Sequence, residues 1–213
     1  MSDDPESHDL EDVSLDPDEK LPDADEVFET YFAPWYEPDD IDRREYAGAR
    51  PDLEEELPVG EAAGELSPLY PDDQEEVAEQ IRVMAEAAGE DWPELLGVEG
   101  SLSLELIDAF DRHFNRAEVA DVIADADPED YGSDLVVLCC ELGAVLGEVM
   151  RREAPELEWL YDWPYWESSL YDSRHGYRIN VFDWAFKKFS EDGVEDGLRS
   201  KVLRCLGLVR FGT

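Results

Sequence analysis

Between residues 73 and 152 the apolar positions recur every three or four residues, a spacing that predicts a run of amphipathic helices. We expect the first helix to be capped by Asp72 or Asp73 and to end at Gly89. Its apolar positions are Val77, Ile81, Met84, Ala85 and Ala88. A second helix is predicted to follow a cap at Ser101 or Ser103, and a short third helix to end before Pro128.

The segment Asp134–Arg152 is apolar on nearly all sides, which predicts a long helix at the centre of the fold. Gly143 and Gly147 lie about one turn apart on it. We expect them to let a neighbouring backbone approach closely. The acidic residues within this run argue against a membrane span, which needs about 20 apolar residues with few charges.

After Pro155 the period of the pattern changes from about 3.6 to 2, which indicates strands. Three strands are expected at residues 157–163, 166–172 and 177–181, with a hairpin turn at 173–176. Asn180 is a candidate cap for a helix that ends at Gly193, and a last helix follows. The pattern predicts an α+β fold: a helical N-terminal half with a long central helix, a small antiparallel three-stranded sheet with helices on one face, and two C-terminal helices.

Residues 1–72 have a different character from the rest, with 25 acidic and 4 basic residues, many prolines and few apolar positions. We expect an acidic, largely extended or disordered arm, followed by a single α+β domain at 73–213. A short aromatic segment at 27–36 interrupts the arm, and Pro34 limits its helix to two turns. The aromatic residues of this segment share one helix face: Phe28, Tyr31, Phe32 and Trp35. Two roles are open for it, docking onto the chain's own domain or docking onto another protein.

The formal net charge is −40, with 57 acidic residues against 17 Lys and Arg. On a folded surface of about 10,000 Å² these net charges lie about 16 Å apart, so their repulsion is felt at 0.15 M salt and is largely screened at 1 M. The excess of acids and the scarcity of lysine resemble the cytoplasmic proteins of salt-in halophilic archaea. The last forty residues are mildly basic, with 8 basic and 5 acidic residues, so docking of the acidic arm near this end is favourable.

The chain begins without a basic and hydrophobic leader, and its three cysteines cannot form a disulfide framework. We therefore expect a cytoplasmic protein with buried free thiols. No cofactor motif is present: there is no Gly-rich phosphate loop after a strand, no GxSxG elbow and no HExxH. The expected cofactor is none.

Two stretches of the C-terminal third are similar to motifs of an uncharacterised family of small, mainly bacterial proteins. Residues 142–149, LGAVLGEV, resemble its GAYLGEV helix, and residues 179–188, INVFDWAFKK, resemble its INPF-containing segment. Val145 replaces the aromatic residue and Val181 the proline. The resemblance implies an intervening set of strands with a tryptophan. Some such domains look like immunity or antitoxin proteins, so it also implies binding to another protein; it implies no catalytic residues.

Candidate chemistry is sparse. Glu141 and Glu148 share a helix face inside the apolar run, where paired carboxylates could serve an enzyme or, with a histidine such as His175, a metal site. The simpler interpretation is an exposed stripe, with Glu148 paired to Arg152 four residues on, and a solvated His175 in the hairpin turn.

Ten of the 23 aromatic residues fall within residues 159–186. They could pack under the helices or form a partner-binding patch, because Trp and Tyr are common interface anchors. Our leading hypothesis is a non-enzymatic, protein-binding, cytoplasmic protein that uses Trp159, Trp163, Trp166 and the 27–36 segment. The alternatives are an enzyme or metal-binding protein using Glu141 or Glu148, and an acidic nucleic-acid mimic. No membrane partner is expected, and the net charge disfavours nucleic acid.

Overall fold

A computed structural model describes residues 20–36, 52–55 and 57–211 of the chain. Residues 1–19 and 37–51, for which the sequence predicts an extended or disordered arm, lie outside the described ranges. The helices, with two 3₁₀ turns labelled η, are α1 (Ala24–Tyr31), η1 (Ala33–Trp35), α2 (Ala63–Leu66), α3 (Pro71–Leu96), α4 (Leu104–His113), α5 (Arg116–Asp125), α6 (Asp134–Glu153), η4 (Tyr165–Glu167), α7 (Val181–Lys188) and α8 (Leu198–Phe211). The strands are β1 (Leu53–Glu55), β2 (Leu157–Leu160), β3 (Ser169–Asp172) and β4 (Tyr177–Ile179). The predicted α+β class is confirmed.

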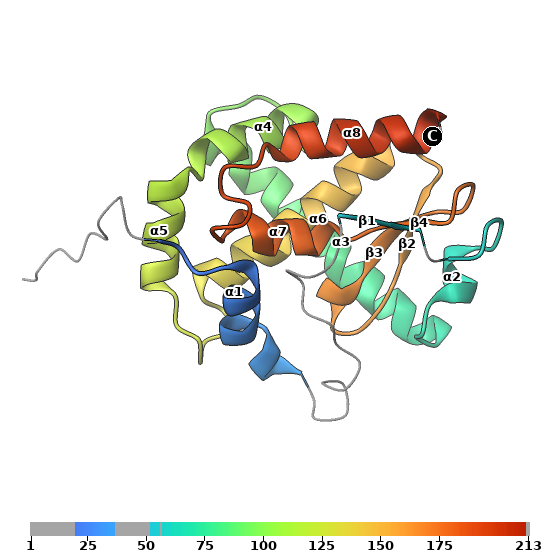
Figure 1. Cartoon of the computed structure of the whole chain (residues 1–213), viewed down its shortest axis with the longest axis horizontal. Helices are drawn as coiled ribbons and strands as arrows, with labels where there is room; N and C mark the ends of the chain where they lie inside the picture. Colours follow the sequence, from blue (N-terminus) through green and yellow to red (C-terminus); the bar gives the residue numbers. More distant parts are fainter. Residues whose placement is uncertain (1–19, 37–51, 56, 212–213) are drawn as a thin grey trace, which may run out of the picture.

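Helix α6 lies at the centre of the molecule, where it packs against α3 and α7 (Figure 1). Its two glycines admit aromatic side chains rather than the backbone expected from the sequence. A Cβ atom added at Gly143 would lie 2.2 Å from Cδ1 of Phe182, and one added at Gly147 would lie 2.1 Å from Cζ2 of Trp159. These glycines therefore set the distance between α6 and the layer formed by α7 and β2.

The sheet is antiparallel and has the strand order β1-β4-β3-β2, one strand more than predicted. The extra strand comes from the N-terminal arm: Leu53 pairs with Ile179 at the edge of β4. Strand β1 has only three residues, two of them acidic, so the sequence shows no alternation of apolar and polar positions there. The opposite face of the sheet is also covered, since Leu160 and Tyr171 form a second apolar cluster with Ala63 of α2. The expectation of helices on one face only is therefore wrong.

The observed strands β2, β3 and β4 are shorter than predicted, because the chain stops pairing with the neighbouring strand earlier than the sequence pattern indicates. Strand β2 ends at Leu160, paired with Ser169, and the N–H of Asp162 donates instead to the hydroxyl of Ser168 at 3.0 Å. Trp163 therefore lies in the loop between β2 and η4 and not on a strand face with Trp159.

Helix α3 continues past Gly89, where it was predicted to stop, and ends at Gly97 in the left-handed conformation with φ 67°. At Gly89 the missing side chain leaves room for Leu102, 3.2 Å from the position of a Cβ atom. The cap also differs from the prediction, because Pro71 occupies the first turn and Tyr70 is the N-cap residue. At α4 the predicted cap is present: Ser103 accepts from the N–H of Leu106.

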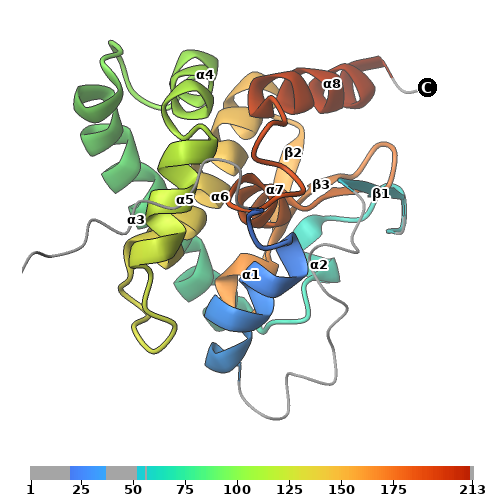
Figure 2. The ribbon, with the colours of Figure 1, turned by 60° about the vertical axis from the view of Figure 1, so that its left-hand side comes forward.

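The aromatic segment of the arm folds back into the core. Asp23 and Glu26 form a capping box that starts α1, and the N–H of Ala24 donates to Asp192 at 2.8 Å. Phe28 and Phe32 are fully buried, with ring centroids 5.5 and 4.4 Å from that of Phe186 on α7. Figure 2 shows α1 beside α7. The packed structure thus includes residues well before the predicted boundary at 72 and 73.

The second attachment of the arm is an ion cluster at the start of β1. The carboxylate of Asp52 lies 3.3 Å from Nζ of Lys187, 3.8 Å from Nζ of Lys201 and 3.6 Å from the guanidinium of Arg204. These cations belong to α7 and α8, in the mildly basic C-terminal forty residues. The arrangement agrees with docking of the acidic arm near the basic end.

We expect the net charge to make folding depend on salt. Raising KCl from 0.1 to 2 M should raise the melting temperature by about 10 °C, which is roughly 3 kcal/mol for a chain of this size, because the repulsion among 40 net charges is screened. Thermal melts followed by circular dichroism measure this. A melting temperature that falls with KCl would show that the Asp52 cluster and other specific ion pairs outweigh the mean repulsion.

Candidate functional site

A hollow of about 410 Å³ opens between α3 and α6, and we call it the α3/α6 hollow. This volume falls within the usual range for ligand sites. Its walls are mainly apolar: Val83 and Met84 come from α3, Val136, Val137 and Cys140 from α6, and the rings of Tyr131 and Tyr165 complete it.

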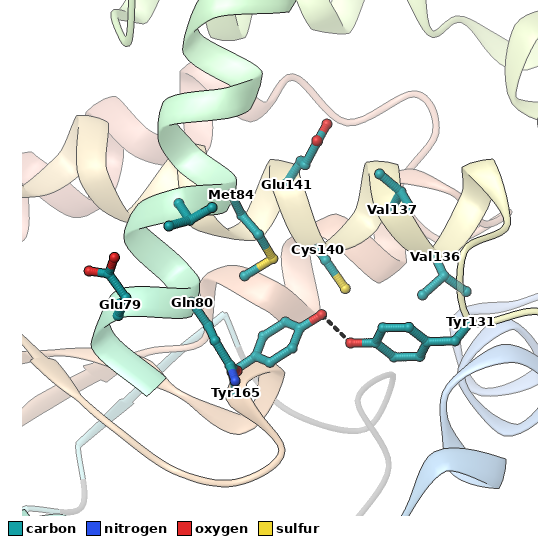
Figure 3. A pocket seen from close by; sticks show the side chains of 10 residues that line it. Glu79, Gln80, Met84, Tyr131, Val136, Val137, Cys140, Glu141 and Tyr165 are labelled. Atoms are coloured by element: carbon teal, nitrogen blue, oxygen red, sulfur yellow. Dashed lines mark hydrogen bonds between the residues drawn. The ribbon is translucent and has the colours of Figure 1, made fainter. Parts of the chain in front are cut away.

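The two tyrosines form one end of the hollow (Figure 3). Their hydroxyl groups are hydrogen-bonded to each other, and the side chain of Cys140 lies beside this pair. Burial raises the pKa of Cys140 to about 12, so its thiol is protonated and a poor nucleophile at neutral pH. Burial also raises the pKa of Tyr165 and of Tyr131. These groups therefore offer a neutral surface with hydroxyl groups and no strong acid or base.

The rim of the hollow exposes large apolar side chains. Val83 on α3 is 49% exposed, Val137 on α6 is 40% exposed, and Tyr131 in the loop before α6 is 39% exposed. Trp35, 37% exposed, extends this surface, with its ring centroid 5.3 Å from that of Tyr131. An apolar surface beside a hollow is typical of a site that binds another molecule.

Helix α3, which forms one wall of the hollow, is strongly acidic over its whole length. Helix α3 carries nine acidic residues and one basic residue, Arg82, and Arg82 is paired with Glu79 and Glu86. Of the acidic residues, Glu79 and Glu141 line the hollow itself, and burial raises the pKa of Glu141. A ligand at this site meets an apolar centre beside an acidic helix.

Most of the aromatic residues predicted to bind a partner lie in the core. Phe28 and Phe32 are fully buried, Tyr31 is 8% exposed, and Trp159 and Trp166 are below 5%. Trp35 and Trp163, the latter 48% exposed, remain on the surface. The aromatic residues of 159–186 therefore form no continuous surface patch, because β2 and β3 pack under α6 and α7 and turn their rings inward.

Tyr36 joins the N-terminal segment to η4 through a buried polar network. Its hydroxyl group accepts from the indole N–H of Trp166 at 2.8 Å and donates to the carboxylate of Glu167. Trp166 is therefore buried against Tyr36 of the N-terminal segment. It helps to fix this segment to the domain and is not available to a partner protein.

The two candidate acids of α6 each bind a tryptophan. Glu141 accepts from the indole N–H of Trp92 at 3.2 Å, and Glu148 accepts from that of Trp159 at 2.8 Å. Glu148 is also 2.8 Å from Arg151, three residues on. The predicted pair of Glu148 with Arg152 is wrong, since Arg152 donates to the carbonyl oxygen of Leu102. Both carboxylates hold α6 to its neighbours.

His175 is placed by a carboxylate in its own turn. Its Nδ1 lies 2.7 Å from Oδ2 of Asp172, which is fully buried, while Oδ1 of Asp172 accepts from the N–H of Arg174 at 3.0 Å. The pair orients the imidazole. Neither Glu141 nor Glu148 is part of it.

The described residues hold no group of three or more His, Cys, Asp or Glu side chains placed to bind a metal ion. Neither Glu141 nor Glu148 therefore belongs to such a group within the described ranges. Within the same ranges, none of the helices combines the length and apolar character needed to cross a bilayer.

Apart from Glu141, which was a candidate from the sequence and lines the α3/α6 hollow, the residues of this hollow were not predicted as a site. A weak signal exists: Val83 lies two positions after Ile81, on the side of α3 away from its apolar stripe, and so it is an apolar residue without a place in the core. For Tyr131, in the loop before α6, no sequence signal distinguishes a site residue from a core residue.

The chain matches no protein-family model, no curated protein and no solved structure. The motif-level similarity of residues 142–149 and 179–188 to a small bacterial family therefore stays a prediction.

Proposed function

We propose that the protein is a non-catalytic binding protein that holds an apolar segment of a partner protein in the α3/α6 hollow. The observation that carries this proposal is an apolar hollow of about 410 Å³ whose rim residues Val83 and Val137 remain 49% and 40% exposed. Large side chains anchored in such a hollow contribute most of the affinity of many protein interfaces.

The partner segment is expected to carry basic residues on both sides of its apolar anchor. The reason is helix α3, one wall of the hollow, which has nine acidic residues and one basic residue over its whole length, so that a cationic flank gains from charge complementarity. Residues 1–19 of the chain contain nine acidic residues and no Lys or Arg, so this acidic helix repels them. A second copy, with its own net charge of −40, is repelled in the same way.

The proposal keeps the protein-binding role that the sequence predicts, but it places the binding site at the α3/α6 hollow instead of at the predicted aromatic residues. Of the predicted anchors, Trp35 lies at the rim next to Tyr131, whereas Trp159 and Trp166 serve the core. An immunity or antitoxin role, in which the partner is a toxin, rests on the motif resemblance alone. An acidic nucleic-acid mimic would engage its target through carboxylates and has no use for an apolar hollow.

Site-specific photocrosslinking tests the proposal. A benzophenone amino acid placed at Val83 or at Val137 should capture the same protein in a lysate kept at molar KCl. The same group at Leu203 on α8, which is 46% exposed, is the matched control. Sequencing of the crosslinked peptide should show an apolar anchor with Lys or Arg on both sides.

Affinity measurements with the purified partner complete this test. Val83→Asp should weaken binding by about 30-fold, the loss of one central anchor, while Leu203→Asp should change it less than about threefold. Equal capture at Leu203, a crosslink to the chain itself, or full affinity in Val83→Asp would contradict the proposal. The last of these results is the one that a carboxylate-only mimic predicts.

A further inference from the structure

A second hollow, of about 390 Å³, lies where the loop between β2 and η4 approaches the start of α3. We call it the Trp163 hollow. The indole of Trp163 is 48% exposed and forms one wall. The remaining lining is apolar or acidic: Pro68, Leu69, Val77, Asp73, Glu76 and Asp162. An exposed aromatic face and three carboxylates thus share one concave surface.

The acidic groups come from two elements that the fold brings together. Asp73 and Glu76 are three residues apart on α3, so their side chains lie on one side of the helix. Asp162 is fixed in the loop, where its Oδ1 accepts from the N–H of Trp163 at 2.8 Å. Among the described residues, none of the ion pairs with Lys or Arg involves Asp73 or Glu76. The carboxylates of Asp73 and Glu76 therefore have no cation from the described part of the chain.

From this arrangement we infer that the Trp163 hollow receives an arginine side chain of the partner protein; the inference rests on the proposed function and adds the chemistry of a second anchor. A cation over an indole face is attracted by the ring, most strongly over Trp. A planar guanidinium can stack on the indole and also bind a carboxylate through two N–H groups, which an ammonium cannot do. The volume exceeds the needs of a bare ion and suits a side chain that enters with its apolar stem along Leu69 and Val77.

The test uses N-acetylarginine amide as the probe and the indole N–H signals in ¹⁵N NMR as the readout, at the lowest KCl that keeps the protein folded. The Trp163 signal, assigned with Trp163→Phe, should shift in a saturable way at constant ionic strength. The other five indole signals should move little. N-acetylglutamine amide, which has no charge, should produce no comparable shift, and N-acetyllysine amide should bind more weakly.

Two variants of α3 separate a built site from general attraction to the acidic surface. Glu76→Gln should weaken binding of the probe about threefold to fivefold, the upper range for one partly exposed ion pair. Glu75→Gln removes the same charge one residue away, outside the lining of the hollow, and should leave binding unchanged. Equal losses in both variants, or equal shifts by the arginine and glutamine probes, would overturn the inference.

The outcome is independent of the α3/α6 hollow. Val83→Asp lies outside the lining of the Trp163 hollow and should leave the arginine shift intact. An intact arginine shift together with no protein crosslinked at Val83 would contradict only the proposed function. A protein crosslinked at Val83 whose binding survives Trp163→Ala and Glu76→Gln without loss would contradict only the arginine site.

Discussion

Phe32→Ala is expected to lower the free energy of unfolding by about 3–5 kcal/mol, the usual cost of removing a buried phenylalanine ring. The ring is fully buried, and its centroid lies 4.4 Å from that of Phe186 and 5.5 Å from that of Trp166. Its removal leaves a cavity between the arm, α7 and η4 that the surrounding rings cannot fill. Urea unfolding at fixed KCl, followed by circular dichroism, measures the loss.

Trp35→Ala is the matched control, because it removes a larger ring only three residues away. Trp35 is 37% exposed and contacts Tyr131 at the surface, so its removal should cost less than about 1 kcal/mol. A loss in Phe32→Ala no greater than that in Trp35→Ala would show that the aromatic segment does not belong to the core.

Gly147→Ala is expected to destabilise the protein by about 2–3 kcal/mol, although alanine is the better helix former by about 1 kcal/mol. The added methyl group would lie 2.1 Å from Cζ2 of Trp159 and 2.3 Å from its Cη2. The ring cannot retreat freely, because its indole N–H donates to Glu148 and because it is only 4% exposed. Either the ring loses this hydrogen bond or α6 moves away from β2.

The control is Gly207→Ala in α8, where no atom lies within 4 Å of the new Cβ atom. This change should leave the free energy of unfolding unchanged or raise it by up to about 1 kcal/mol, since alanine restricts the unfolded chain and favours the helix. Urea unfolding of both variants provides the comparison. Equal stabilities of Gly147→Ala and Gly207→Ala would show that Trp159 does not pack on Gly147.

The elements that the sequence predicts well are those with a strong period. Helix α6 was expected at 134–152 and is observed at Asp134–Glu153, because its length and apolar content leave no alternative. The three strands after Pro155 were recognised from their period of two, although each is shorter than predicted. Short strands end where a side chain, such as Ser168, takes over a backbone hydrogen bond, and no pattern of apolar residues marks that point.

Features that depend on partners distant in the sequence were missed. Strand β1 has no apolar alternation and exists because β4 offers an edge and Lys187, Lys201 and Arg204 offer charges to Asp52. Gly89 was expected to end a helix, since glycine does so in many proteins, but here its small size serves the packing of Leu102. From the sequence alone, a glycine that ends a helix cannot be told from a glycine whose small size makes room for a neighbouring side chain.

The candidate site was predictable only in part. The clustered aromatic residues pointed to Trp163, which does lie in a surface hollow. Most of that cluster instead packs in the core, because a small sheet under a helical layer needs large side chains to fill the space. The α3/α6 hollow depends on the separation of two helices and on the loop that carries Tyr131, neither of which a single sequence specifies.

The hydrogen bond between Ala24 and Asp192 joins positions 168 residues apart, and this has a consequence for biosynthesis. At roughly 5–20 residues per second, a ribosome needs roughly 10–30 s to make the partner of the first helix after that helix has emerged. During this time Phe28 and Phe32 lack the ring of Phe186 that contacts both of them in the folded protein. We therefore expect the last step of maturation to come only after α7 has left the exit tunnel, and chaperones that recognise aromatic segments to bind the chain until then.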